Sequence, residues 1–140
     1  MTGARDSDTL STLARAEAAR IKEFAETLLA ALPGVTVLHS RTGLVMVPMR
    51  DTAGGTSFHL GEVLVSEAHV RRDGVEGYGM RRGRDLEAAM AMALVDLALA
   101  SGVEAARCRA FCDDEAARQA ACDRDTLRRV EATRIDMETF

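Results

Sequence analysis

Three arginines stand immediately before a segment whose apolar pattern predicts a helix over residues 86–100: Arg81, Arg82 and Arg84. The free backbone N–H groups and the dipole at a helix N-terminus favour anions, so cations placed there need an anion or a carboxylate nearby. One interpretation is that these arginines contact a phosphate or a phosphonate. The other is that Asp85, Glu87 or a neighbouring subunit pairs with the arginines, and the frequency of surface ion pairs favours it.

A glycine-containing loop is the second place where an anion could bind. Residues 53–57 read Ala-Gly-Gly-Thr-Ser, so the loop could present successive N–H groups as an anion nest, with Thr56 and Ser57 adding hydroxyls. The loop has neither the lysine nor the spacing of a P-loop. A plain connection between two strands, with glycines at positive φ, is the competing interpretation.

Glu62 follows this loop on a predicted strand, where it shares a face with Leu60 and Leu64. If that face is buried, the carboxylate needs a partner. Glu62 could be a functional acid, but a structural hydrogen bond to the backbone or to an arginine is the favoured interpretation.

The cysteines and histidines form no recognisable metal or catalytic set. The chain has three cysteines and no apolar segment at its N-terminus, so a disulfide framework is not expected. Cys108 and Cys112 would lie one turn apart on a helix, but a structural zinc site needs four ligands and no histidine accompanies them. We therefore expect free thiols and no bound metal. The histidines come from different strands, and no serine or cysteine lies in a nucleophile-elbow sequence.

The elements before the loop are expected to be helix and then strands. Apolar residues at helical spacing predict one amphipathic helix from Asp8 to Leu32, or two helices if the chain bends near Ser11. Two strands are expected over 35–40 and 44–49, and the second is apolar on both faces. We expect one of these faces to lie against a helix and the other against another chain.

A hairpin is expected after the loop, because Asp73-Gly74 is typical of a type I′ turn between strands over 58–72 and 75–81. The resulting register pairs Arg72 with Val75, Arg71 with Glu76, Val70 with Gly77, His69 with Tyr78 and Ala68 with Gly79. One face then carries polar side chains: Glu67, His69, Arg71, Glu76 and Tyr78. The other face is smooth because of its glycines, so the helix over 86–100 can approach it closely. The apolar stripe of that helix comprises Leu86, Ala89, Met90, Ala93, Leu94 and Leu97.

The C-terminal part of the chain is again helix-forming. We expect a break around 112–114, followed by a last helix from Glu115 to about Met137. This helix has few large apolar residues: Leu127, Val130 and Ile135. Such a thin stripe is typical of a helix that docks on a partner or stays solvated.

Length, composition and charge limit the possible fold classes and partners. With 140 residues and a net charge of -4, the chain is expected to form a single domain, 1–140, with its own core. The negative net charge argues against a nucleic-acid partner, because such proteins normally carry an excess of positive charge to neutralise phosphates. Without an apolar run of the ~20 residues that a membrane span needs, we expect no membrane partner and a cytoplasmic location. The predicted fold is α+β, an antiparallel sheet of about four strands with helices packed mainly on one face.

Short sequence blocks follow one another in a particular order between Ser40 and Ser101. The chain reads Thr-Gly-Leu-Val-Met at 42–46, Gly-Gly-Thr at 54–56, Phe-His-Leu-Gly-Glu at 58–62, Gly-Tyr-Gly at 77–79 and Gly-Arg-Asp at 83–85. In order and spacing these blocks resemble the PhnG family, a subunit of the bacterial carbon-phosphorus lyase system. The matching residues are Thr42, Gly43, Gly54, Gly55, Thr56, Gly61, Glu62, Val70, Arg71, Gly79, Gly83, Arg84 and Asp85. The chain departs from the family pattern at Ser57, Glu67, Ala68 and His69.

The resemblance implies a subunit that scaffolds or completes the active site of another chain. The implied partners are PhnH, PhnI and PhnJ, with PhnL joining transiently, in an obligate hetero-oligomer. The implied activity is the formation of ribose 1-phosphonate 5-triphosphate from ATP and a phosphonate, with ATP as substrate of the complex and no cofactor bound by this chain. Contacts with phosphate, phosphonate or a partner would fall on Gly54, Gly55, Thr56, Glu62, Arg84 and Asp85.

Two alternatives remain open. In the first, the chain is a free-standing homodimeric α+β protein that binds a phosphorylated small molecule between the Gly54-Gly55 loop and Arg84. In the second, it is a homodimeric scaffold without a ligand, and the strand over 44–49 pairs across a two-fold axis.

Overall fold

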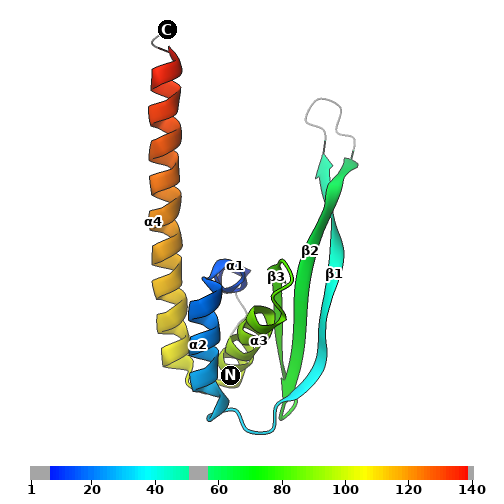
Figure 1. Cartoon of the computed structure of the whole chain (residues 1–140). Coiled ribbons are helices and arrows are strands. Elements are labelled where there is room, and N and C mark those ends of the chain that lie inside the picture. The colour runs from blue at the N-terminus through cyan, green and yellow to red at the C-terminus, as the bar shows by residue number, and fades with distance from the viewer. Residues whose placement is uncertain (1–6, 51–56, 139–140) are drawn as a thin grey trace.

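The computed structural model describes residues 7–50 and 57–138. Within them the elements follow in the order α1 (Ser7–Arg15), α2 (Ala18–Leu29), β1 (Thr36–Arg50), β2 (Ser57–Arg72), β3 (Val75–Arg82), α3 (Leu86–Ser101) and α4 (Ala105–Glu138). The strands form one antiparallel sheet in the order β1-β2-β3, and the helices lie on one side of it (Figure 1). The predicted α+β class is confirmed.

The sheet has three strands in the described residues, where about four were expected. The difference lies in β1, because the segment between the two expected strands does not turn. Arg41 pairs with Glu67 and Gly43 pairs with Val65, so the whole of 36–50 runs along β2. The long partner strand offers hydrogen bonds to these backbone groups, and a turn would give them up.

The hairpin between β2 and β3 is the predicted one. Asp73 and Gly74 have φ values of 51° and 78°, which a type I′ turn requires. All five expected pairs are present, from Arg72 with Val75 to Ala68 with Gly79. The smooth face of this hairpin is therefore turned towards α3, as expected.

Two glycines of β3 allow α3 to lie directly on the sheet. A Cβ atom at Gly77 would overlap the carbonyl oxygen of Ala93 and would lie 2.6 Å from the Cβ of Leu97. At Gly79 a Cβ would overlap the carbonyl oxygen of Ala89. The backbone of α3 is thus in direct contact with β3. Residues larger than glycine at these two positions would not permit this distance.

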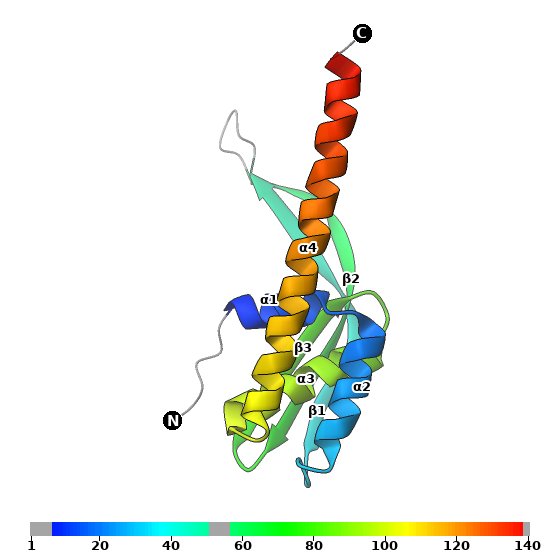
Figure 2. The same cartoon turned by 90° about the vertical axis from the view of Figure 1, so that its left-hand side faces the viewer.

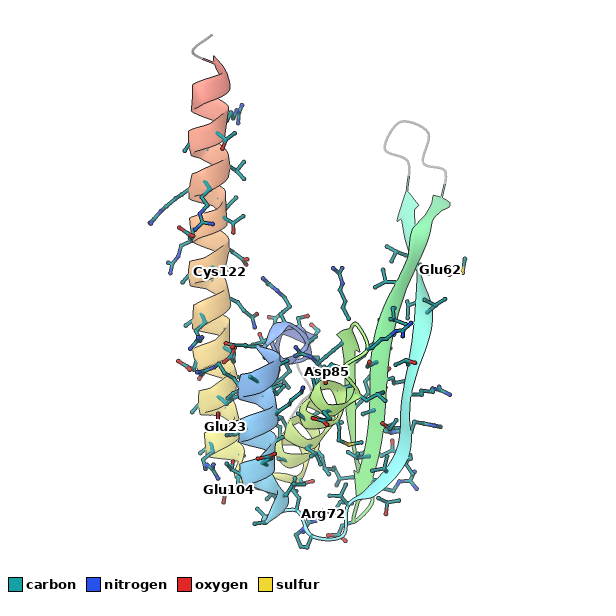
Figure 3. The ribbon with its side chains drawn as sticks, viewed as in Figure 1. Glu23, Glu62, Arg72, Asp85, Glu104 and Cys122 are labelled. Carbon is teal, nitrogen blue, oxygen red and sulfur yellow. The ribbon has the colours of Figure 1, made fainter. Side chains whose placement is uncertain are left out.

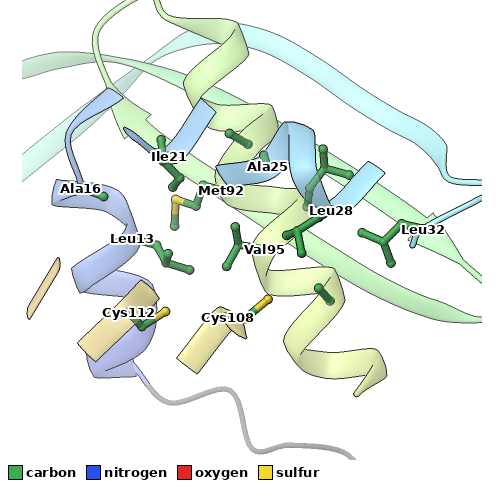
Figure 4. Packing of buried hydrophobic residues seen from close by; sticks show 13 residues of the cluster. Leu13, Ala16, Ile21, Ala25, Leu28, Leu32, Met92, Val95, Cys108 and Cys112 are labelled. Atoms are coloured by element: carbon green, nitrogen blue, oxygen red, sulfur yellow. The ribbon is translucent and has the colours of Figure 1, made fainter. Parts of the chain in front are cut away.

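α3 is buried on nearly every side, because other helices cover the face that it turns away from the sheet. Met92 and Val95 point into an apolar core shared with Leu13, Ile21 and Leu28 (Figure 4). α2 therefore packs mainly on α3 as a third layer, whereas α1 also contacts β3. In α3 itself, Leu86 is 38% exposed, so it does not belong to the buried stripe in which it was expected.

The N-terminal segment forms two helices that meet at residues 16–17, not near Ser11. Glu17 has an extended backbone, with φ -59° and ψ 126°. The carbonyl oxygens of Leu13 and Ala16 accept hydrogen bonds from Arg81 of β3 instead of continuing the helix. The bend is thus fixed by a residue far along the chain, and no local helix-breaking residue marks it.

α4 is one continuous helix of 34 residues, so the break expected around 112–114 is wrong. Cys112 and Glu115 are buried on the side that faces α1 and α2, while Arg20 of α2 bonds both Asp114 and Glu115. These carboxylates bind Arg20 of α2 and do not cap a new helix. The backbone of α4 therefore continues without a break.

Two parts of the chain project from the same end of the helical body (Figures 1 and 2). The helix arm comprises residues 120–134 of α4, and the strand arm comprises residues 43–47 of β1 with 61–64 of β2. Every residue from 120 to 134 is exposed. Within the described residues, no helix has both the length and the apolar character that crossing a membrane requires.

Candidate functional site

The three arginines before α3 have different surroundings. Arg81 is partly buried and donates hydrogen bonds of 2.6 Å to the carbonyl oxygens of Leu13 and of Ala16. Burial lowers the pKa of Arg81 from its usual value, and the charge of Asp85 opposes this effect. The donors of Arg81 are therefore engaged in joining β3 to the end of α1.

Asp85 caps α3 and pairs with a lysine that sequence reasoning missed. Its Oδ1 accepts a hydrogen bond of 3.1 Å from the N–H of Ala88, and its Oδ2 lies 2.7 Å from Nζ of Lys22. The Lys22 ammonium and the Ala88 N–H lower the pKa of Asp85. Lys22 also lies 4.0 Å from Glu87, so this lysine of α2 faces both carboxylates that had been considered as partners for the arginines.

Arg82 and Arg84 are exposed at the end of β3 and just beyond it. Among the described residues, neither guanidinium makes a hydrogen bond or an ion pair. The group on Arg84 is thus free to meet an anion or a partner chain. Its role as a contact stays a prediction.

Glu62 is exposed, so the condition under which its carboxylate would need a partner is not met. It shares a strand face with Leu64, and this face continues into the strand arm, beyond the cover of α3 (Figure 3). Within the described chain, no hydrogen bond or ion pair joins Glu62 to Arg84. The other candidate contacts, Gly54, Gly55 and Thr56, lie outside the described residues.

A network of ionisable side chains crosses the outer face of the sheet, which α3 does not cover. His69 lies at its centre, with Nε2 3.3 Å from Oε2 of Glu76. The ring of His39 stacks on His69 with a centroid separation of 5.9 Å, and Tyr78 meets it edge-on at 6.1 Å. The predicted contact of His69 with Tyr78 is confirmed.

Two ion pairs complete this network: Arg71 with Glu76 at 2.6 Å and Arg41 with Glu67 at 3.3 Å. Hydrogen bonds from Arg71 and His69 lower the pKa of Glu76, so this carboxylate stays ionised. Burial and the neighbouring Glu67 raise the pKa of Tyr78, which keeps the phenol protonated. The network offers donors and acceptors to a partner surface, but it presents no activated nucleophile.

Sequence reasoning placed most members of this network on one face, because the hairpin turn fixes the register of β2 with β3. It did not find His39 and Arg41. No two-residue turn joins β1 to β2, so nothing in the local sequence sets the register that brings β1 alongside His69 and Glu67.

The cysteines lie where helical spacing predicted, but in an apolar setting. Cys108 and Cys112 are buried one turn apart on α4, and burial raises the pKa of each thiol to about 11. Both are therefore protonated and unreactive near neutral pH. Cys122 is exposed on the helix arm (Figure 3). In the part of the chain that the structure describes, no three His, Cys, Asp or Glu side chains are grouped so that they could hold a metal ion.

Each arm carries large apolar side chains that are exposed to solvent. On the strand arm, Leu44 is 63% exposed and Met46 52% on one face, while Val45 is 40% exposed on the other. The expectation that one of these faces lies against a helix is wrong, because α3 does not reach this far. On the helix arm, Leu127 and Val130 are 64% and 58% exposed. Adjacent apolar side chains left in water are typical of surfaces that bind other proteins.

Comparison with known proteins agrees with the order of the sequence blocks. A family model described as "Phosphonate metabolism protein PhnG" matches residues 4–140. A relative from Rhizobium meliloti (strain 1021), named alpha-D-ribose 1-methylphosphonate 5-triphosphate synthase subunit PhnG, is 39% identical over 100 residues. The match covers 71% of this chain and 64% of the relative, which is less than two thirds of the relative's length. The motifs, the family match and this relative together show that the chain belongs to the PhnG family of phosphonate metabolism proteins.

Proposed function

We propose that this chain is an accessory subunit of a multi-subunit enzyme that forms ribose 1-phosphonate 5-triphosphate from ATP and a phosphonate. The observation that carries the proposal is the family match over residues 4–140, together with a relative named as a subunit of such a synthase. The transferase activity belongs to the assembly, and this chain is not catalytic alone.

The partners that we propose are PhnH, PhnI and PhnJ, with PhnL bound transiently, in the cytoplasm. ATP enters as a substrate of the assembly, and this chain holds no cofactor of its own. The two projecting arms support a role as a subunit, because their exposed apolar side chains have no cover within the described chain. The outer-face network adds a polar surface that a partner could meet.

Co-purification tests this proposal. The tagged chain is expressed with the neighbouring PhnH, PhnI and PhnJ chains, and mass spectrometry identifies what elutes with it. We expect a stable assembly for the wild type and a reduced yield for Leu127→Asp, which places a charge on the helix arm. Leu29→Asp is the matched control, since Leu29 is 52% exposed on α2, in the body.

A chain that elutes alone, folded and without these partners, would contradict the proposal and bring the free-standing alternatives forward. Loss of partners in Leu29→Asp to the same degree as in Leu127→Asp would instead show that the helix arm is not the surface they use.

We also propose that the candidate contacts act within the assembly, where Arg84 offers the sharpest test. Arg84 is exposed, and its guanidinium makes no hydrogen bond or ion pair among the described residues. If it binds the phosphonate or the triphosphate, Arg84→Ala raises KM about tenfold or more, as expected for a lost charge-assisted hydrogen bond. If it contacts a partner, the yield of the assembly falls. Arg82→Ala is the control, and an Arg84→Ala assembly unchanged in both respects would overturn either role.

A further inference from the structure

The two edges of the sheet differ in how their backbone groups are satisfied. On β3, the N–H of Tyr78 donates a hydrogen bond of 2.9 Å to Oδ2 of Asp96, a buried residue of α3. On β1, the backbone forms hydrogen bonds with β2, and no other part of the described chain supplies a partner. An open edge of this length is a template for a further strand.

Irregular pairing, proline and charged residues usually prevent an edge strand from pairing with a further strand. In β1 such features lie at the two ends and are nearly absent from the middle. The pairing with β2 is irregular between Val37 and His39 and again between Val47 and Pro48, and Pro48 has no backbone N–H. Between these points, Arg41 is the one charged residue, and Glu67 of β2 already pairs with it. The stretch from Ser40 to Val47 therefore stays regular, nearly uncharged and open.

We propose that β1 pairs with β1 of a second copy of this chain, antiparallel across a two-fold axis that passes near Val45. In this register Val45 faces its own symmetry mate, and Leu44 faces Met46 of the second copy, twice. All three side chains are exposed in the single chain, so the pairing brings apolar groups together on both faces of the joined sheet.

Charge and shape both favour a second copy as the occupant of this edge. With the axis at Val45, Arg41 faces position 49, an uncharged methionine, so no two like charges oppose each other. Each helical body lies beside the Thr36 end of its own sheet, whereas Val45 lies in the projecting strand arm (Figure 1). An antiparallel pair thus carries the two bodies to opposite ends of the joined strands. The pairing is independent of the partners proposed above and is tested on the chain alone.

The mass of the full chain in solution tests the dimer. Light scattering over a range of concentrations is expected to give twice the chain mass of 15.1 kDa. Val45→Lys would place two lysines opposite each other at the axis, so we expect it to raise the dissociation constant at least tenfold. Leu127→Lys, on the helix arm, is the control and should leave the dimer intact. A mass of one chain at every concentration, or equal effects of the two variants, would overturn the proposal.

Crosslinking tests the register. In a Cys122→Ser background, Val45→Cys would bring two thiols together across the axis, within the Cα separation that a disulfide tolerates. Met46→Cys is the matched control, because position 46 faces position 44 of the second copy and not its own mate. We expect rapid oxidation to a covalent dimer for Val45→Cys alone. Equal crosslinking of the two variants, or none for Val45→Cys, would rule out this pairing.

Discussion

Gly77 and Gly79 have a structural role that follows from what surrounds them. Each faces a backbone carbonyl of α3 that a side chain would strike. Gly43, also in the sheet, has no atom of another residue near the place where its Cβ would be. Glycine thus permits close packing at two positions and has open space around it at a third. A family motif rich in glycine therefore says little about which residues bind a ligand or react.

Replacing Gly77 with alanine should therefore destabilise the fold, whereas the same change at Gly43 should be nearly neutral. The new methyl group at position 77 would force α3 away from the sheet, at a cost of about 1–3 kcal/mol. Chemical denaturation of the two variants measures the difference in unfolding free energy. Similar values for Gly77→Ala and Gly43→Ala would mean that α3 does not lie as close to β3 as described.

Asp85 should make stability depend on pH in the acid range. Its pKa in the folded chain lies below the usual value of about 3.8 because of Lys22 and the Ala88 N–H, so its contribution is present above that pH and is lost as the pH falls through the folded-state pKa. Asp85→Asn keeps a capping side chain but removes the ion pair. We expect its stability to change less than that of the wild type between pH 5 and acid unfolding. Parallel curves for the two proteins would contradict this role.

α4 consists of two halves with different environments. The first half buries Cys108, Cys112 and Glu115 against α1, α2 and α3, and Arg20 holds it through paired carboxylates. In the second half, which includes the helix arm, every residue from 120 to 134 is exposed, and its ion pairs include Asp123 with Arg15 of α1 and Asp125 with Arg129. Helices gain most of their stability from packing, so the arm is held mainly by continuity with the first half.

Hydrogen exchange should reveal this division. In the isolated chain, amides in the helix arm should exchange roughly tenfold faster or more than those in 108–118, because opening the arm exposes no core. Within the co-purified assembly the arm should become protected. Uniform protection along α4 in the isolated chain would show that something else, such as a second copy, already covers the arm.

The sequence predicts elements well where local residues decide them. Asp73-Gly74 fixes the turn and register of β2 with β3, and Gly102, at φ 72°, ends α3. It predicts less well where distant residues decide. The bend at Glu17 depends on Arg81, and the continuity of α4 depends on Arg20. The contacts of Lys22 with Asp85 are likewise invisible until α2 is laid on α3.

At the scale of the whole molecule, a well-packed body supports two arms with little cover of their own. The candidate contacts follow the same division, because Asp85 serves the body while Glu62 lies on the strand arm (Figure 3). Sequence patterns indicated an apolar surface to share on β1 and on the last helix. They could not indicate that both surfaces project from one end of the body, since this depends on how the layers stack.

Assembly should therefore stabilise the chain as a whole. A partner that binds only the folded form adds about 2.7 kcal/mol when it is present at a hundred times its dissociation constant. We expect the unfolding temperature of this chain to be higher in the co-purified assembly than alone, and Leu127→Asp to reduce the increase. Unchanged thermal unfolding on assembly would show that the arms bind nothing that depends on their fold.

The core described above joins the two ends of the chain, and this has a consequence for biosynthesis. Arg15 of α1 lies 3.0 Å from Asp123, and Leu13 packs in one cluster with Cys108 and Cys112. The N-terminal helices therefore have no complete core to join until the start of α4 has left the ribosome. Until α4 is available, the apolar side of α1 and α2 is open to chaperones.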